Sequence, residues 1–233
     1  LVGSEMCIRD SARNIFKLIC VCFLHLFNAF QQGYEDSFYL CTEFIKEQMA
    51  MSELRKLKIV EMNRLTVEEF KEAEKLPLVV VLDEVRSLHN IGAVFRTSDA
   101  FLVNAIYLCG ITATPPHPEM HKTALGAEYS VDWKYFKKTQ EAVEDIKNQG
   151  YTVLAIEQCE GSTLLDELTL EKDKKYAIVL GNEVKGVQQE VVNMCDGCIE
   201  IPQYGTKHSL NVSVTAGIML WEFANKLIRL KKN

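Results

Sequence analysis

Residues 77–85 read PLVVVLDEV, and this apolar run indicates the architecture of the chain around it. A strand with one solvated face alternates apolar and polar residues, whereas every residue from 78 to 82 is apolar here. Such a run is typical of a strand that is buried on both faces, as in a parallel sheet covered by helices. The run therefore predicts a central strand of an α/β protein.

On the C-terminal side of this run, apolar segments alternate with segments of helical spacing. Further strands are expected at residues 105–110 (AIYLCG), 151–157 (YTVLAIE), 176–181 (YAIVLG) and 198–202 (CIEIP). Helices are expected at residues 90–101, at residues 187–195, and at residues 139–150, where Gly150 ends the helix. Strands that alternate with helices of this length indicate βαβ units and an open sheet.

On the N-terminal side, Thr66 and Glu69 have the spacing of a capping box, which predicts a short charged helix that Pro77 stops. Residues 112–120 contain three prolines and are expected to form a loop. The segment HPEMH at 117–121 does not match the H-E-x-x-H metal pattern, and its proline interrupts the helix that would align both histidines. We therefore predict a loop there, without a metal.

The stretch SLNVSVT, residues 209–215, alternates polar and apolar residues like a half-buried strand. A helix fits the longer segment better, because five residues fall on one helical stripe: Leu210, Val214, Gly217, Ile218 and Trp221. We therefore predict a closing helix from residue 209, with Ser209 able to cap its first turn. Unpaired N–H groups at such an end can hold an anionic or polar ligand.

The composition is that of an ordinary globular protein with one main domain, since 48% of the 233 residues are apolar and 25% are charged. The net charge of −6 argues against a protein that coats nucleic acid without selectivity, but it is compatible with a local basic site. The eight cysteines are too few and too unevenly spaced for a disulfide framework, which favours reduced thiols in the cytosol. Cys195 and Cys198 have C-x-x-C spacing without a second pair or a nearby histidine, so we predict neither a zinc nor a redox site there.

The first fifty residues are expected to lie outside the fold. They begin without Met, and the run VGSEMCIRDS resembles a recurrent sequencing-adapter artefact. We interpret residues 1–50 as a non-native or disordered upstream extension, fused to a gene that starts at Met49 or Met51. The alternative is a targeting signal, because residues 15–30 are apolar and follow three basic residues. No clear cleavage site follows them, and the run is short for a membrane span.

Three chain segments bring glycines and polar residues to positions just after strands of the predicted sheet. They are Asn90, Gly92 and Arg96 after the first strand, Gly181, Asn182, Glu183 and Gly186 after the strand at 176–181, and Ser209 and Asn211 after the last strand. In open α/β sheets, ligands bind beyond the carboxyl ends of the strands. A single site at this edge explains the three segments better than packing does.

The same segments resemble the motifs of the SpoU (TrmH-like) family of RNA 2′-O-ribose methyltransferases, within the SPOUT superfamily. LDEVRSLHNIGAVFRTSDAF (82–101) is similar to its N-x-G-x-x-x-R motif, and IVLGNEVKGV (178–187) is similar to its G-N-E-x-x-G motif. IEIPQYGTKHSLNVSVTAG (199–217) is similar to its I-P-x-x-G-x-x-x-S-L-N-V-S motif. The resemblance extends over residues 78–228, and every motif residue is present and in order.

The resemblance implies an α/β fold with an open parallel sheet, helices on both faces and a C-terminal trefoil knot, assembled as a homodimer. It implies a SPOUT methyltransferase domain at residues 77–233, preceded by a short N-terminal helical segment at residues 51–76. The implied cofactor is S-adenosyl-L-methionine, and the residues implied to contact it are Gly181, Gly186, Ile201, Pro202 and Leu210.

The resemblance also implies catalytic residues. Arg96 would act on the ribose 2′-hydroxyl, although a guanidinium is always protonated and is therefore a poor base. We expect Arg96 to bind the neighbouring phosphate and to stabilise developing negative charge, while the phosphate or a water molecule takes the proton. The other implied residues are Asn90 and Asn211 as positioning amides, Glu183 orienting Arg96 or the ribose, and Ser209 shaping the loop.

RNA needs a local positive rim, and six residues near the motifs could supply it: Arg86, His89, Lys122, Lys185, Lys207 and His208. The alternative function is an RNA-binding or assembly factor on the same fold that has lost catalysis, but the intact motif residues favour the enzyme. A nucleotide-dependent oxidoreductase is disfavoured, because no G-x-G-x-x-G follows a strand. The sequence therefore predicts a cytoplasmic tRNA or rRNA 2′-O-methyltransferase that needs neither a metal nor a membrane.

Overall fold

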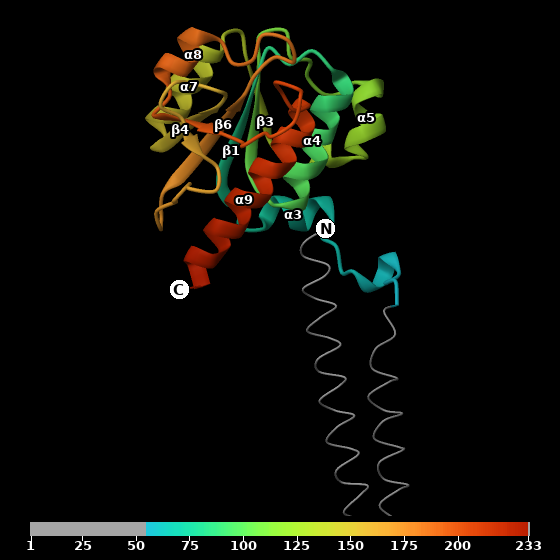
Figure 1. The fold of residues 1–233 in the computed structure, drawn as a ribbon. Coiled ribbons are helices and arrows are strands. Elements are labelled where there is room, and N and C mark those ends of the chain that lie inside the picture. The colour runs from blue at the N-terminus through green and yellow to red at the C-terminus, as the bar shows by residue number, and fades with distance from the viewer. Residues whose placement is uncertain (1–54, 233) are drawn as a thin grey trace, which may run out of the picture. The chain divides into compact units, whose positions relative to one another are not determined.

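The computed structural model describes residues 55–232, which divide between two units, residues 55–64 and residues 65–232 (Figure 1). The smaller unit has one turn of 3₁₀-helix, η1 (Ile59–Glu61). The larger unit contains the sheet and all the α-helices of the described residues. The extension predicted at residues 1–50 lies outside the described range.

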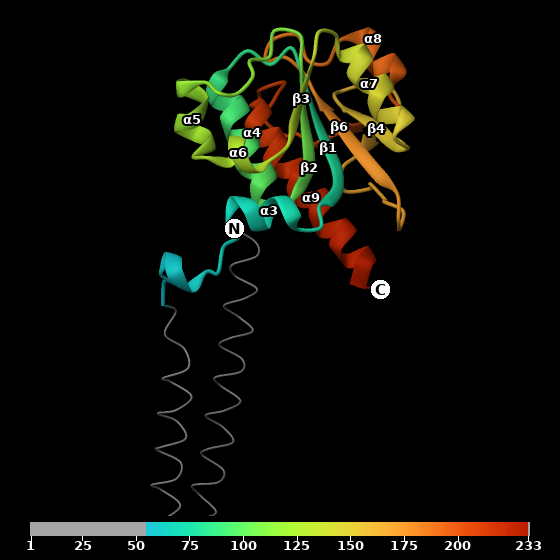
Figure 2. The ribbon, with the colours of Figure 1, turned by 180° about the vertical axis from the view of Figure 1, so that it is seen from behind.

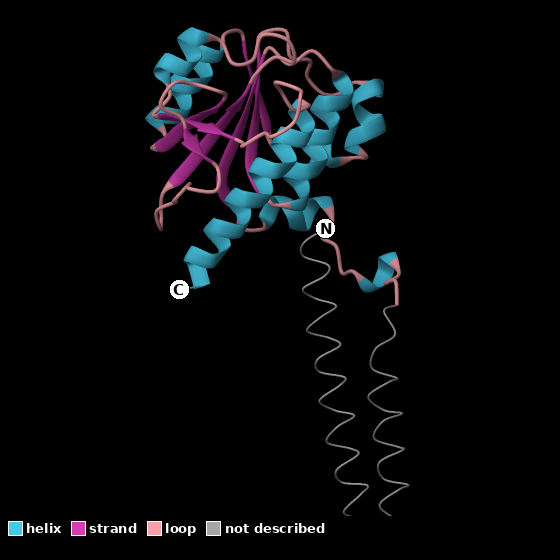
Figure 3. Ribbon diagram, viewed as in Figure 1, coloured by secondary structure: helices cyan, strands magenta, loops and turns pink. Residues whose placement is uncertain are grey.

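Seven parallel strands form one sheet in the order β3-β2-β1-β6-β4-β7-β5, and Figure 3 shows them as a layer between helices. Their bounds are β1 (Leu76–Asp83), β2 (Val103–Cys109), β3 (Trp133–Phe136), β4 (Tyr151–Ile156), β5 (Thr163–Leu164), β6 (Lys175–Leu180) and β7 (Gly197–Glu200). The predicted apolar run forms β1, where Val80 pairs with Ile106 of β2 on one side and Ile178 of β6 on the other. All strands therefore have their carboxyl ends at the same edge, and the predicted parallel α/β sheet is confirmed.

Helices cover both faces of the sheet, as the view from behind in Figure 2 makes clear. One face is covered by α4 (Leu88–Ala100), α5 (Pro118–Ala124), α6 (Ala127–Ser130) and α9 (Val212–Lys232), and the other by α7 (Thr139–Asn148) and α8 (Gln189–Met194). The side chains of β1 alternate between the two layers, with Leu78, Val80 and Leu82 in the first and Val79 and Val81 in the second. The central strand is thus buried on both faces, because each face has its own apolar layer of helices.

The capping box predicted on the N-terminal side begins α3 (Val67–Glu72). The backbone N–H of Glu69 donates to Thr66 Oγ1 at 3.2 Å, and the backbone N–H of Thr66 donates to Glu69 Oε2 at 2.8 Å. The helix ends at Glu72, however, and Pro77 lies inside β1, so Pro77 is not the residue that stops it. Pro77 is tolerated near the start of this strand because the pairing with β2 is irregular there.

The loop predicted at residues 112–120 is shorter than expected, because α5 begins at Pro118. His117 is the capping residue of α5, and its Nδ1 accepts the backbone N–H of Glu119 at 3.2 Å. Proline suits the first helical position, where its missing N–H removes no helical hydrogen bond. The prediction that this proline interrupts a helix is therefore wrong. Neither α6 nor β3, each four residues long, was predicted from the sequence.

The closing helix α9 starts at Val212, three residues after the predicted start. Asn211 caps it, because its Oδ1 accepts the backbone N–H groups of Ser213 at 2.9 Å and of Val214 at 3.4 Å. Ser209 is therefore not the cap. Both residues have a side-chain oxygen that suits a cap, and the sequence alone did not decide between them.

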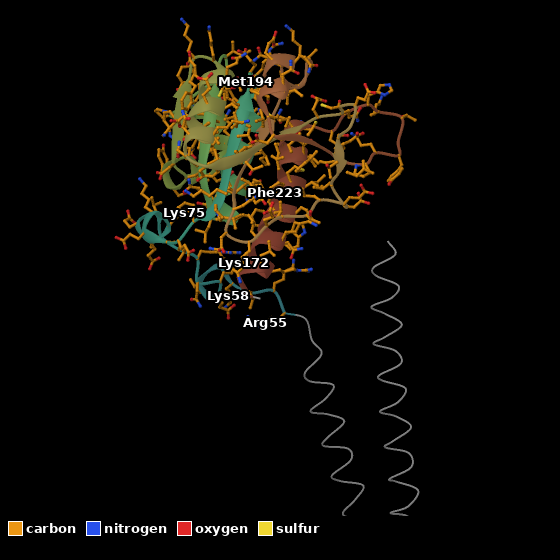
Figure 4. All side chains as sticks on the ribbon, turned by 90° about the vertical axis from the view of Figure 1, so that its left-hand side faces the viewer. Arg55, Lys58, Lys75, Lys172, Met194 and Phe223 are labelled. Atoms are coloured by element: carbon orange, nitrogen blue, oxygen red, sulfur yellow. The ribbon has the colours of Figure 1, made fainter. Side chains whose placement is uncertain are left out.

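Most of the apolar stripe predicted for the closing helix faces away from the sheet, although Ile218 packs against the core. Leu210, Val214 and Trp221 have exposed side chains, and Trp221 is 60% exposed. A second apolar stripe packs on the sheet instead: Val212, Ala216, Met219, Leu220, Phe223, Ala224 and Leu227. Figure 4 labels Phe223, whose ring stands edge-on to that of Tyr176 in β6, with 5.8 Å between the centroids. α9 is thus apolar on two sides, and only one of them is covered within the described chain.

Candidate functional site

A cleft of about 690 Å³ opens at the carboxyl edge of β4, β6 and β7. Two loops form its walls: residues 181–187 after β6, called the β6 loop below, and residues 201–211 after β7, called the β7 loop. Four of the predicted cofactor contacts line the cleft: Gly181, Gly186, Ile201 and Leu210. The fifth, Pro202, lies next to Ile201 but is not part of the lining.

The β6 loop is a tight turn that requires glycine at both ends. A Cβ atom on Gly181 would lie 2.1 Å from the backbone of Gly186 and Val187, a distance that no side chain can occupy. Gly186 has φ of +68°, and a Cβ there would lie 2.1 Å from the carboxylate of Glu157. Backbone hydrogen bonds of 3.0 and 2.9 Å between Asn182 and Gly186 close the turn. The two glycines are thus explained by the geometry of the cleft wall.

Glu157, at the end of β4, is a cleft residue that the sequence analysis missed. Its carboxylate accepts the backbone N–H of Val187 at 3.0 Å and that of Gln158 at 2.9 Å, and it lines the cleft. Glu157 therefore holds the end of the β6 loop in place. Its one sequence signal was an acidic residue directly after a buried strand, at the edge where ligands were expected.

A chain of hydrogen bonds joins the three predicted segments. Asn90 Nδ2 in α4 donates to Glu183 Oε1 in the β6 loop at 3.0 Å, and Asn211 Nδ2 in the β7 loop donates to Asn90 Oδ1 at 3.2 Å. Glu183 also accepts the backbone N–H groups of Arg86 and Ser87, each at 3.0 Å. Residues that are up to 121 positions apart in the sequence are therefore held together at one rim of the cleft.

These hydrogen bonds determine the charge of Glu183. Partial burial alone would raise the pKa of its carboxyl, but the N–H groups of Arg86, Asn90 and Ser87 favour the charged form and hold the pKa below its usual value. Glu183 is therefore ionised at neutral pH and is a poor proton acceptor. Within the chain, the oxygens of Glu183 bind Arg86, Ser87 and Asn90, and its orientation of Arg96 or of the ribose stays a prediction.

Arg96 lies apart from the cleft of its own chain. Its side chain is exposed on α4, it is not among the residues that line the cleft, and no carboxylate of residues 55–232 forms an ion pair with it. Ser209 and Asn211, in contrast, both line the cleft. The structure thus brings together four of the five predicted catalytic residues, at the cleft or hydrogen-bonded to its rim, and leaves Arg96 outside.

The predicted basic rim divides into two groups. His89 Nε2 and Lys122 Nζ both approach Glu119, at 3.7 and 2.7 Å, so the charge of Lys122 is partly balanced on the surface of α4 and α5. The remaining four predicted RNA contacts are exposed on the segments around the cleft: Arg86, Lys185, Lys207 and His208. Lys185 and His208 line the cleft itself.

Two further features concern the part of the chain that the structure describes. Between residues 55 and 232, no three His, Cys, Asp or Glu side chains are grouped so that they could hold a metal ion. Over the same range, no helix has the length and apolar character that crossing a membrane requires.

The fold is shared by solved structures of RNA-modifying enzymes. The TrmH/SpoU tRNA modifying enzyme of A. aeolicus is 28% identical with a TM-score of 0.62, and the match covers 75% of this chain and 86% of that chain. The AdoMet-bound rRNA methyltransferase of Sinorhizobium meliloti is 28% identical with a TM-score of 0.61, and the match covers 68% of this chain and 60% of that chain. The parallel sheet with a cleft at its carboxyl edge is therefore the SPOUT class of methyltransferase fold.

Within that class, the sequence determines the family. Residues 77–221 match the SpoU rRNA Methylase family, and the chain belongs to it. The tRNA (guanosine(18)-2′-O)-methyltransferase of Aquifex aeolicus (strain VF5) is 31% identical over 167 residues, which are 70% of this chain and 76% of that protein. A protein of Staphylococcus aureus (strain MSSA476) assigned to the TrmH family of tRNA/rRNA methyltransferases is 31% identical over 156 residues, or 67% of this chain. The chain spans 62% of the length of that relative.

Proposed function

We propose that this protein is an S-adenosylmethionine-dependent RNA methyltransferase, which transfers a methyl group to a ribose 2′-hydroxyl of tRNA or rRNA in the cytoplasm. The observation that carries the proposal is the hydrogen-bonded chain Glu183–Asn90–Asn211, which joins the three family motifs at the rim of one cleft. The name of the Aquifex aeolicus relative, a 2′-O-methyltransferase of guanosine in tRNA, supports the same acceptor.

The residues of the cleft fit the proposed cofactor. A volume of about 690 Å³ is within the usual range for sites that bind small molecules. Three carboxylates, Glu157, Glu183 and Glu200, line the cleft beside one lysine, Lys185, and this excess of negative charge suits a ligand with a positive sulfur and an ammonium group. The missing side chain at Gly181 lets the β6 loop fold back tightly on itself, and this turn forms one wall of the cleft.

S-adenosylmethionine supplies a methyl group bonded to a positively charged sulfur. The residues of this chain must hold the ribose in line with that bond, exclude water and assist the loss of the hydroxyl proton. Asn90 is fixed between Glu183 and Asn211, so the rim that faces the RNA is preorganised. Ser209 lines the cleft and has a hydroxyl that can orient the ribose. Glu183 stays ionised and positions the rim, which leaves an RNA phosphate or a water molecule to take the proton.

A homodimer would complete this site. Arg96 does not line the cleft of its own chain, while the neighbouring helix α9 exposes the apolar side chains of Val214 and Trp221. Covering that stripe with a second copy buries apolar surface, and α4, which packs beside α9, would approach the partner's cleft. In this arrangement Arg96 of one chain stabilises negative charge in the cleft of the other. We also propose that the C-terminal part of the chain forms the trefoil knot that the family resemblance implies.

The function is tested by incubating the full chain with methyl-labelled S-adenosylmethionine and with tRNA or rRNA from cells that lack 2′-O-methylation. Label is expected in one of the two RNA classes, and Arg96→Ala is expected to abolish transfer while cofactor affinity remains, because Arg96 lies outside the cleft. RNA that is retained by the protein but never labelled would instead support the catalytically silent RNA-binding factor.

A further inference from the structure

Two strongly exposed apolar side chains lie on the loops that form the walls of the cleft, and one of them, Val184, lines it. Tyr204 in the β7 loop is 96% exposed and Val184 in the β6 loop is 80% exposed, the highest values for large apolar side chains between residues 65 and 232. Single exposed apolar residues are common on protein surfaces. Here, however, the two most exposed ones lie on the two loops that wall a single cleft. Their position therefore indicates a contact with a ligand at this cleft.

Cations stand beside both side chains. Lys185 follows Val184 directly, and Lys207 lies three residues after Tyr204. Both lysines are exposed, and neither forms an ion pair with a carboxylate of the described residues. A flat aromatic ring and an aliphatic side chain next to two unpaired ammonium groups match a nucleotide, whose base is apolar on its faces and whose phosphate is anionic.

Building on the proposed function, we propose that Tyr204 is a stacking platform for an unpaired nucleotide next to the methylated one, with Val184 as a further apolar contact and with Lys185 and Lys207 on its phosphates. A nucleotide inside a duplex has both base faces covered by its neighbours and cannot stack on Tyr204. The substrate at this cleft is therefore a loop or a single strand of RNA, and a paired stem does not fit.

The test compares Tyr204→Ala with Tyr204→Phe in the full chain, using a single-stranded RNA oligonucleotide and the same sequence closed into a duplex. Tyr204→Ala is expected to weaken single-strand binding by about tenfold, a typical loss for one stacked base, and Tyr204→Phe is expected to restore it. Duplex binding should be equal in all three proteins. The matched control is Tyr129→Ala on α6, where the tyrosine is also exposed but lies outside the two loops that form the cleft walls.

The stacking role is overturned if Tyr204→Ala binds the single strand like the wild type, if Tyr204→Phe is as weak as Tyr204→Ala, or if Tyr129→Ala has the same effect. Cofactor affinity and melting temperature serve as checks, because a side chain that is 96% exposed contributes no packing. The result is independent of turnover. Wild-type protein that binds RNA and never methylates it would overturn only the proposed function. An active enzyme whose single-strand binding is unchanged by Tyr204→Ala would overturn only the stacking role.

A separate observation concerns two thiols, Cys159 and Cys198, each next in the chain to a residue that lines the cleft. The sulfur atoms of Cys159 and Cys198 lie 2.9 Å apart, and the Cys198 thiol also donates to the backbone oxygen of Glu157 at 3.2 Å. Cys195, the other cysteine of the C-x-x-C spacing, donates its thiol hydrogen bond to the backbone oxygen of Val191 instead. Cys198 therefore pairs with a residue 39 positions away, and the C-x-x-C spacing does not describe the pair.

We infer that Cys159 and Cys198 form a reversible disulfide when the protein meets hydrogen peroxide. The sulfur of Cys159 attacks one peroxide oxygen, which gives a sulfenic acid and one water molecule. The sulfur of Cys198 then attacks the sulfenic sulfur, and a second water molecule leaves as the S–S bond forms. Burial raises the pKa of the Cys198 thiol to about 12, which disfavours Cys198 as the first nucleophile, and in the second step its proton leaves with the sulfenic hydroxyl as water.

The disulfide removes the Cys198 hydrogen bond to Glu157, the residue whose carboxylate holds Val187 in the β6 loop. Peroxide treatment of the full chain is expected to lower its mass by about 2 Da through a 159–198 crosslink and to weaken S-adenosylmethionine binding several-fold, both reversed by dithiothreitol. Cys159→Ser should abolish both effects, and Cys195→Ser should keep them. A crosslink at other positions, or a 159–198 crosslink that leaves cofactor affinity unchanged, would contradict the inference.

Discussion

At the scale of single residues, Glu183 connects the sequence motif to the geometry of the site. Its two oxygens accept three N–H donors from the segment after β1, and these donors lower its pKa. The motif G-N-E-x-x-G predicted that Glu183 matters, but not which atoms it binds. Those partners are 93 to 97 positions away, so they depend on β1 and β6 being neighbours in the sheet.

Replacing Glu183 by Gln should change how stability depends on pH. A carboxyl whose folded pKa is lowered stabilises the fold above its unfolded pKa and loses this contribution as pH falls through the folded pKa. Wild type should therefore be more stable than Glu183→Gln near pH 7, and the difference should shrink below about pH 4.5. Denaturant unfolding of both proteins across this range is the measurement, and a difference that is constant with pH would show that the carboxylate is not held in its charged form.

At the scale of elements, the strands were easier to predict than the phase of the last helix. β1 is apolar on both faces, and no other local structure fits that pattern so well. α9 is also apolar on two sides, so its sequence did not reveal which side packs on the sheet. The loop predicted around Pro118 was wrong for a related reason, since a proline can begin a helix as well as interrupt one.

The start of α9 gives a prediction that separates two candidate caps. Asn211→Ala removes the acceptor for two backbone N–H groups and should cost about 1 kcal/mol of stability, whereas Ser209→Ala should leave stability unchanged. Asn211→Asp keeps the acceptor but loses the amide N–H that Asn90 accepts, so it should retain most of the stability and lose methyl transfer. Thermal melts with parallel transfer assays are the test, and an equal loss from Ser209→Ala would mean that the helix begins earlier.

At the scale of the whole molecule, the cleft depends on contacts that no local pattern contains. Glu157 belongs to no motif, and its role appears only because β4 and β6 are neighbours, which brings Val187 within 3.0 Å of its carboxylate. Arg96 is the opposite case, because it is a motif residue that the fold of one chain leaves outside the cleft. The sequence thus predicted the class of site, while its assembly depends on the order of the strands and, in our proposal, on a second chain.

Mixing two inactive proteins tests whether Arg96 acts between chains. Arg96→Ala leaves the cleft intact, and Gly181→Ala distorts the cleft wall because its Cβ would lie 2.1 Å from the backbone of Gly186. Co-expression should restore about a quarter of wild-type transfer, because half of the randomly formed dimers are mixed and each has one complete site. As a control, adding Trp221→Glu to both proteins should separate the dimer and abolish the restored transfer. An inactive mixture would mean that Arg96 acts in the cleft of its own chain.

The chemical identity of the labelled nucleoside tests the central claim most directly. After transfer from labelled S-adenosylmethionine, the RNA is hydrolysed in alkali, which cannot cleave next to a ribose whose 2′-oxygen is methylated, and the products are separated. We predict label in an alkali-resistant dinucleotide that yields a 2′-O-methyl nucleoside on enzymatic digestion. Label on a base, in a fragment that alkali cleaves normally, would contradict the ribose acceptor while leaving the fold and the cleft in place.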